Sequence, residues 1–231
     1  LLFDYTGEFS DPANAAWLEK FETNSGAVLN PMEHPLPFTP FKDFTGKSIQ
    51  EINIYSSSLS KALAAIANDA RISANMDERL SMAIINAYKS NNGKPVNFKA
   101  IRDNYIRLLP ENKQDAVDSV ISVLNSLIRS ELFEDEDKID LLNDCYIINL
   151  GRYEKEGIYA KAIVYFVISK LNAIYDSLPP QMADEERYEL RHFTIIDEAH
   201  YMLGFDNKPL QNLIKVGRNK GMSIILATQN M

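Results

Sequence analysis

The chain has 231 residues, with 24 lysines and arginines against 32 aspartates and glutamates, which gives a formal net charge of −8. This acidic balance excludes a broad surface that coats nucleic acid, although it leaves room for a few basic groups on local loops. The single cysteine, Cys145, excludes a disulfide framework and favours a reducing, cytoplasmic compartment. Because it begins an apolar segment, we expect Cys145 to be a buried structural thiol.

The chain opens with an apolar segment that leads into carboxylates. A strand is predicted over residues 1–3, followed by Asp4, a tight turn at Gly7 and then Glu8. A helix is predicted over residues 12–23. The proline-dense run from 31 to 40 excludes both helix and central strand, and its interspersed apolar residues predict a loop pinned to the body of the protein.

Helical periodicity dominates the middle of the chain. Helices are predicted over residues 59–71, with Ser57 or Ser58 as the cap, over 77–89, from Phe98 after an Asn97 cap, and over 112–133. The apolar stripes of these helices are typical of core packing. We therefore divide the chain into a first core part (1–56), an all-α helical insertion (57–140) and a second core part (141–231).

Alternation of strand and helix marks the last third of the chain. Strands are predicted over 146–150, 193–196 and 222–228, with helices over 153–177 and 206–220 between them. Lys161 and Lys170 interrupt the first of these helices, which favours a core helix over a membrane span. Strands joined by helical crossovers predict an α/β fold with a mainly parallel sheet.

Two adjacent carboxylates, Asp197 and Glu198, follow the apolar strand 193–196 directly. Open parallel sheets bind ligands just beyond the carboxyl ends of their strands. In nucleotide hydrolysis one carboxylate holds Mg²⁺ and a second polar group orients the attacking water, so the pair has the form of a Walker B site. Alternatively, the two residues are only the cap and first turn of the next helix, where acids complement the helix dipole.

Two further segments bear on nucleotide binding. Gln229 follows the last strand, where a neutral amide can donate to a γ-phosphate or a water. Alternatively, Gln229 is simply a polar residue where the strand passes into a loop. The segment Gly46-Lys47-Ser48 has the ending of a phosphate loop, but Phe41 stands where the first glycine is required. We therefore expect a surface turn at 46–48 rather than a phosphate site.

The order of these motifs resembles that of the HerA/FtsK superfamily, in particular its HerA branch and the ATPase part of phosphorothioation-linked restriction proteins. The resemblance covers about residues 1–56 and 145–231. The matching motifs are Asp4-x-x-Gly7-Glu8-Phe9, Ile195-Ile196-Asp197-Glu198-Ala199-His200, Gly217-Arg218-Asn219-Lys220-Gly221 and Leu226-Ala227-Thr228-Gln229. It implies a RecA-like P-loop NTPase core, here interrupted by the helical insertion, in a hexameric ring of identical subunits that moves DNA.

The resemblance also implies roles for single residues, with ATP and Mg²⁺ as cofactors. Asp197 would coordinate Mg²⁺, Glu198 would activate the hydrolytic water, and Gln229 would sense the γ-phosphate. Asp4 and Glu8 would lie near the nucleotide.

Arg218 occupies the position that, by the resemblance, reaches into the neighbouring subunit's site as an arginine finger. The alternative is a solvated or helix-capping cation before the terminating Gly221.

The sequence departs from the family pattern in one respect, because no phosphate loop precedes the first strand. We therefore expect an interior piece of a longer protein that is inactive by itself.

The resulting hypothesis is a fragment of an ATP-driven DNA translocase or helicase in DNA processing or defence, such as restriction. Its expected partners are DNA, further copies of itself in a ring, and a nuclease or restriction protein, without a membrane. One alternative is a superfamily 2 helicase, because residues 197–200 spell the DEAH box. The other is a non-catalytic ATPase-like scaffold.

Overall fold

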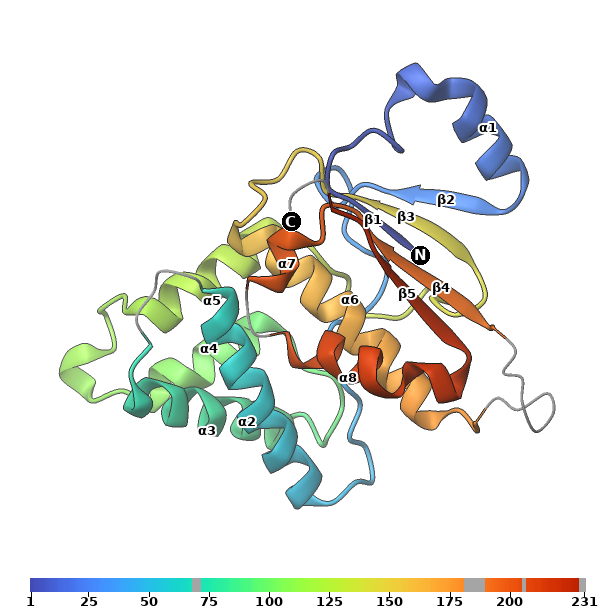
Figure 1. Ribbon diagram of the computed structural model, residues 1–231. Helices are drawn as coiled ribbons and strands as arrows, with labels where there is room; N and C mark the ends of the chain where they lie inside the picture. The colour runs from blue at the N-terminus through green and yellow to red at the C-terminus, as the bar shows by residue number, and fades with distance from the viewer. Residues whose placement is uncertain (68–71, 181–189, 205–206, 229–231) are drawn as a thin grey trace. The chain divides into compact units, whose positions relative to one another are not determined.

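The computed structural model describes residues 1–67, 72–180, 190–204 and 207–228 (Figure 1). These residues form two compact units, one from 1–38 and 138–231 and the other from 39–137. The first unit is the α/β part of the chain and the second is all-helical. The boundary at 38/39 lies well before residue 56 of the sequence-based division, because the first long helix of the second unit begins at Ile49.

A five-stranded, all-parallel sheet forms the centre of the first unit. Its order is β2-β3-β1-β4-β5, so that β1 lies in the middle, between β3 and β4. The strands are β1 (Leu2–Asp4), β2 (Gly26–Leu29), β3 (Cys145–Asn149), β4 (His192–Ile196) and β5 (Met222–Leu226). The prediction of an α/β fold with a parallel sheet is confirmed.

The helices of this unit connect the strands as crossovers (Figure 1). A short 3₁₀ turn (Pro12–Asn14) and α1 (Ala15–Thr23) join β1 to β2, and α6 (Ile158–Ser177) joins β3 to β4. Between β4 and β5 lie α7 (His200–Leu203), α8 (Lys208–Val216) and a 3₁₀ segment (Gly217–Lys220). All strands therefore direct their carboxyl ends to the same edge of the sheet.

Helix α6 is the core helix of the unit. Every side chain from Ala160 to Ile168 is buried, as are Leu171 and Tyr175. By length and composition alone α6 could cross a membrane, but a mostly buried core helix passes the same test. On the sheet, Phe3 pairs in register with Ile148 and Ile196, and all three are fully buried.

The opposite face of the sheet is open over β4 and β5. Phe193 is 46% exposed and Ile225 is 44% exposed. Side chains alternate between the two faces along a strand, and Ile195 pairs with Ile225, so Phe193, Ile195 and Ile225 share this open face. The continuous apolar run 193–196 is typical of a parallel strand buried on both faces, but in the structure Phe193 is exposed on one of them.

The second unit contains four α-helices among its described residues: α2 (Ile49–Ile66), α3 (Ala74–Ser90), α4 (Phe98–Arg107) and α5 (Ser119–Ser130), with a short 3₁₀ helix (Glu111–Lys113) between the last two. Helix α2 begins earlier than predicted, because Ser48 and Glu51 form a reciprocal capping box. The segment Gly46-Lys47-Ser48 is thus a turn, with Gly46 at a φ of +74°, that ends in a cap.

Two further expectations need correction. Helix α5 begins at Ser119 rather than near residue 112, because the Asp118 carboxylate accepts a hydrogen bond from the Ile121 amide at 3.0 Å and so caps the helix there. Cys145 is exposed rather than buried, since it is the first residue of β3, at the amino end of the sheet.

Candidate nucleotide site at the carboxyl edge of the sheet

The carboxyl ends of β1 and β4 lie side by side and bring two carboxylates together. The strands are paired, and the backbone amide of Asp197 donates to the Phe3 carbonyl at 3.1 Å. The Thr6 hydroxyl lies 3.2 Å from Asp4 Oδ1 and 3.2 Å from Asp197 Oδ2. A hydroxyl has one proton, so Thr6 donates to one carboxylate at a time. Thr6 therefore links the two strand ends.

Asp4 organises the loop that follows β1. Its side chain is fully buried and accepts from the Gly7 amide at 2.8 Å, the Ser10 amide at 3.0 Å and the Ser10 hydroxyl at 2.6 Å. Hydrogen bonds to an ionised acceptor are stronger than neutral ones, so this set fixes the loop. Glu8, in the same loop, is exposed. The structure thus gives Asp4 a positioning role, and the contact of either residue with a nucleotide stays a prediction.

The loops after β1 and β3 pack against each other at two glycines. Gly7 has a φ of +79°, and a Cβ on Gly151 would lie 2.8 Å from Gly7 Cα. The ammonium of Lys155 donates to the Tyr5 carbonyl and, at 3.4 Å, to the Gly151 carbonyl. Lys155 therefore adds a positive charge to the loops at this edge.

Glu198 adopts a left-handed backbone conformation, with a φ of +46°. For a non-glycine residue this conformation costs about 1–2 kcal/mol. Bonds on both sides hold it, because the Ala199 amide donates to the Ala227 carbonyl at 2.8 Å and the Ala227 amide to the Ile196 carbonyl at 3.0 Å. The turn after β4 is thus fixed against the end of β5.

The structure argues against the alternative that Asp197 and Glu198 only start a helix. Helix α7 has four residues, Ala199 is its cap residue, and no side chain caps it. The carboxylates are therefore not used to satisfy its first amides.

His200 connects Glu198 to the end of β5. Its Nδ1 lies 3.1 Å from Glu198 Oε2 and 3.1 Å from the Thr228 hydroxyl, and its ring centroid is 4.0 Å from that of Tyr201. The Glu198 side chain is only 12% exposed. Its carboxylate is therefore held in one place beside β5. Gln229 follows Thr228 but lies outside the described residues.

Arg218 lies at the other end of the sheet from this cluster. It belongs to the 3₁₀ segment that precedes β5, whereas Glu198 follows β4, and the two strands are parallel. Its carbonyl accepts from the amide of Gly221, which ends the segment at a φ of +78°. Arg218 is exposed. The structure therefore does not bring Arg218 to the carboxylates of its own chain.

The donor set at this edge fits Mg²⁺ delivered with a phosphate ligand rather than a protein cage. Within the described residues, no group of three or more His, Cys, Asp or Glu side chains is placed to hold a metal. Mg²⁺ is usually bound through one or two carboxylates together with waters and substrate phosphates. Asp197, which receives one hydrogen bond from Thr6, can serve as such a carboxylate.

Sequence reasoning did not identify Thr6 or His200 as members of the site. Thr6 is an unspecified position inside the Asp4-x-x-Gly7 motif. Its polar side chain between two carboxylate-bearing positions is the one sequence feature that points to a place in the site. His200 belongs to the motif Ile195–His200 and to the DEAH box, but neither motif assigns it a role.

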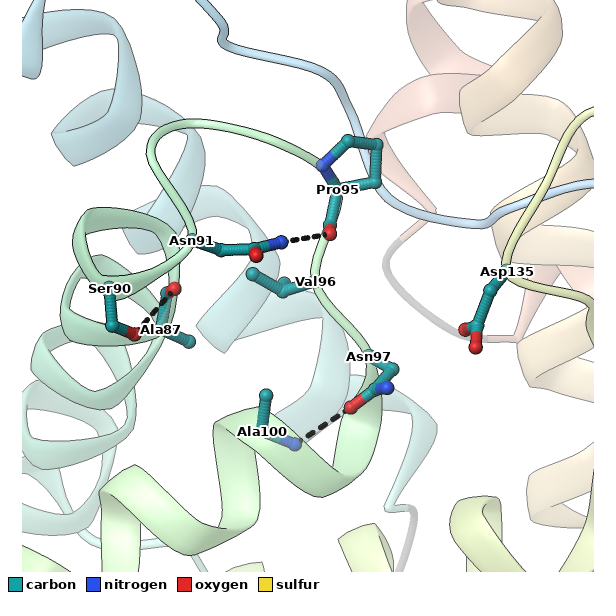
Figure 2. A pocket seen from close by; sticks show the side chains of 8 residues that line it. All are labelled: Ala87, Ser90, Asn91, Pro95, Val96, Asn97, Ala100 and Asp135. Atoms are coloured by element: carbon teal, nitrogen blue, oxygen red, sulfur yellow. Dashed lines mark hydrogen bonds between the residues drawn. The ribbon is translucent and has the colours of Figure 1, made fainter.

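A separate cavity in the helical unit has a volume of about 310 Å³ (Figure 2). Its polar groups serve the local backbone, since the Asn91 amide donates to the Pro95 carbonyl at 2.7 Å and Asn97 Oδ1 accepts from the Ala100 amide at 2.8 Å. Asp135 faces these groups across the cavity (Figure 2). The cavity therefore lacks the paired acid and base groups of a reaction site, in contrast to the carboxyl edge of the sheet.

Comparison with known proteins gives a likeness in structure alone. No protein-family model matches the chain, and no curated protein matches it. Among solved structures, VirB4 of Thermoanaerobacter pseudethanolicus is similar, with a TM-score of 0.58 and 14% sequence identity. The match covers 99% of this chain and 61% of that chain. The fold is therefore a VirB4-like, RecA-type core, and the chain spans about three fifths of the length of the VirB4 chain.

Proposed function

We propose that this chain is part of an ATP-driven DNA translocase or helicase of the HerA/FtsK type, acting in DNA processing or defence. The observation that carries the proposal is the Asp197-Glu198 turn at the carboxyl end of β4, tied to β1 through Thr6 and to β5 through His200. It lies in a RecA-type core that is similar to VirB4, itself a RecA-like ATPase of that superfamily.

In this proposal the two carboxylates divide the work of hydrolysis. Bound ATP–Mg²⁺ supplies the phosphoryl group and the charge that stabilises its transfer. Asp197 holds the metal, largely through water, and Thr6 orients that carboxylate. Glu198 accepts the proton of the attacking water, and His200 keeps its carboxylate oriented.

Two further residues complete the proposed mechanism. Gln229, directly after Thr228, senses the γ-phosphate. Arg218 acts in a neighbouring subunit, which agrees with its exposure and its distance along the strands from the carboxylates of its own chain.

We propose that another segment of the full-length protein supplies the phosphate loop, because G-x-x-x-x-G-K-[ST] does not occur in the 231 residues. The open face of β4 and β5 supports this idea. Parallel sheets are normally covered on both faces, yet Phe193 and Ile225 are 46% and 44% exposed. In addition, β5 is an edge strand in the described sheet and can pair with a further strand.

The partners proposed are DNA, identical subunits in a hexameric ring, and a nuclease or restriction protein in the cytoplasm. The net charge of −8 favours DNA contacts limited to loops that line a channel, where few phosphate contacts per subunit suffice.

The test is DNA-stimulated ATP hydrolysis by the full-length protein and by its Glu198→Gln variant. We expect DNA to raise the wild-type rate, and the variant to lose about 100-fold or more while still binding ATP, because loss of a positioned general base costs about that factor. Glu111→Gln, an exposed glutamate in the helical unit, is the matched control. Normal turnover by Glu198→Gln would refute the assignment. No hydrolysis by the wild type would favour the scaffold alternative.

A further inference from the structure

Helix α1 presents an exposed aromatic surface, formed by Phe9, Trp17 and Phe21. None of the side chains of α1 is buried, and Phe9 and Trp17 are 40% and 43% exposed. The three rings are in contact: Trp17 and Phe21 are stacked with centroids 5.4 Å apart, and Phe9 meets Trp17 edge-to-face with centroids 6.1 Å apart. Phe21 rests on the backbone of β2, since a Cβ on Gly26 would meet its ring at 2.4 Å. The aromatic surface is therefore held in a fixed position at the β2 edge.

An isolated helix as short as α1 gains little stability by itself, so such helices are normally stabilised by packing an apolar face. Aromatic residues are enriched at the cores of protein interfaces, and tryptophan is among the residues that most often dominate the binding energy. Acidic side chains predominate at the rim of this surface, where Glu8, Asp11, Glu19 and Glu22 are exposed together with one cation, Lys20. The aromatic surface therefore fits a partner that combines apolar contact with positive charge.

The α/β unit also carries a surface that combines apolar side chains with positive charge. It is formed by α8 and the 3₁₀ segment that leads into β5. Ile214 and Val216 are 51% and 41% exposed. Three exposed cations, Lys208, Lys215 and Arg218, lie in the same stretch, and residues 207–221 contain no acidic side chain. We call these residues the basic surface.

We propose that the aromatic surface of one copy of this chain binds the basic surface of the next copy. The two surfaces complement each other in charge and both offer apolar contact. They lie toward opposite edges of the sheet, α1 beside β2 and the basic surface just before β5 (Figure 1). A contact between two different surfaces is head-to-tail, and such contacts build closed rings or filaments rather than isolated dimers.

This contact deepens the proposed ring assembly and rests on it, but it makes no use of ATP hydrolysis. It also places Arg218 at the junction between subunits. Single-stranded DNA stacked on the rings is the competing occupant, and the acidic rim repels its phosphates.

Self-association of the full-length protein tests the contact, and the 231-residue chain is measured in parallel for its fluorescence. Trp17 is the single tryptophan of the chain, so its fluorescence reports on this surface alone. We expect the emission to shift to the blue as concentration rises, in parallel with larger species in sedimentation velocity. Trp17→Ala is expected to weaken association about 30-fold or more, in the range of an interface hot spot.

Charge reversal identifies the partner surface. Two double variants each place like charges across the contact, so each should give monomers. The first is Glu19→Lys with Glu22→Lys, and the second is Lys208→Glu with Lys215→Glu. Mixing the two variants makes every junction complementary again and should restore association. The control is Lys99→Glu with Lys113→Glu, which makes the same charge change on exposed residues of the helical unit.

Three results would overturn the proposal: a wild-type protein that stays monomeric at several hundred micromolar, variants that associate normally, or a mixture that remains monomeric. Quenching of Trp17 by oligo(dT) without a concentration-dependent shift would instead assign the surface to single-stranded DNA. Because none of these readouts involves hydrolysis, a failure here is distinct from a failure of the ATPase assignment.

Discussion

A buried histidine makes the stability of the α/β unit depend on pH. His192 begins β4 and is 6% exposed. Its Nδ1 lies 3.4 Å from the Thr194 hydroxyl, and its Nε2 has no hydrogen-bond partner among the described residues. Its ring centroid is 6.3 Å from that of Tyr175, whose hydroxyl also lacks a partner there. Desolvation lowers the pKa of His192 from the ordinary 6.5 to about 4.

The sign and size of the effect follow from this pKa. Between pH 6.5 and 4 the unfolded chain binds a proton at this site that the folded chain does not, so the free energy of unfolding falls as the pH falls. The contribution is present above pH 6.5 and is lost as the pH approaches 4. At about 1.36 kcal/mol per pKa unit, it amounts to about 3 kcal/mol in total and about 2 kcal/mol between pH 7 and 5.

The assay is urea unfolding of the wild type and of His192→Leu at pH 7 and pH 5. We expect the wild type to lose about 2 kcal/mol more than the variant on acidification, because leucine removes the titration but fills much of the same space. Each protein is its own reference at pH 7, so a general loss of stability in the variant does not affect the comparison. An equal loss in both proteins would refute the argument that His192 is held neutral by burial.

Two further substitutions test the loops of the site. Gly151→Ala should destabilise the protein by about 1–3 kcal/mol in urea unfolding, because its Cβ would lie 2.8 Å from Gly7 Cα. Gly46→Ala, which meets no atom within 4 Å, should cost only the left-handed backbone conformation, about 1 kcal/mol. If both substitutions lower the free energy of unfolding equally, the contact between the two loops does not contribute to stability. Thr6→Val should lower ATP hydrolysis of the full-length protein about 10-fold, and Thr6→Ser should restore it, because only the hydroxyl links the carboxylates of Asp4 and Asp197. Full activity of Thr6→Val would exclude this role.

The parallel sheet was predictable because its signals are local. Short apolar runs separated by helical stretches leave few topologies, and the carboxyl ends of parallel strands must share an edge. The meeting of Asp4 and Asp197 at that edge therefore follows from sequence spacing. The link between them does not, since it depends on the rotamer of Thr6 within the loop after β1.

The start of α2 shows why some boundaries could not be predicted. Serines favour caps, so Ser57 or Ser58 was the predicted cap of a helix over residues 59–71. In the structure the Ser56 hydroxyl donates to the Ile52 carbonyl at 2.7 Å, and the Ser60 hydroxyl donates to the Asp77 carbonyl at 3.0 Å. Hydroxyls in the middle of a helix are satisfied this way without ending it. Only the packing of α2 against α3 distinguishes the two outcomes.

The backbone conformation of Glu198 is the feature of the site that could not be predicted from the spacing of residues in the sequence. Four non-glycine residues in the described chain have a positive φ, and Ser25, Asn92 and Glu131 each follow the end of a helix. A left-handed residue there satisfies the last carbonyls of the helix, so these three have an ordinary structural cause. Glu198 instead follows a strand, and no helix end gains from its conformation. The conformation sets the chain between β4 and β5 so that the Glu198 carboxylate meets His200, whose ring in turn contacts the Thr228 hydroxyl. A backbone held in a sparsely populated conformation is typical of functional sites, and the proposed role of Glu198 would account for it.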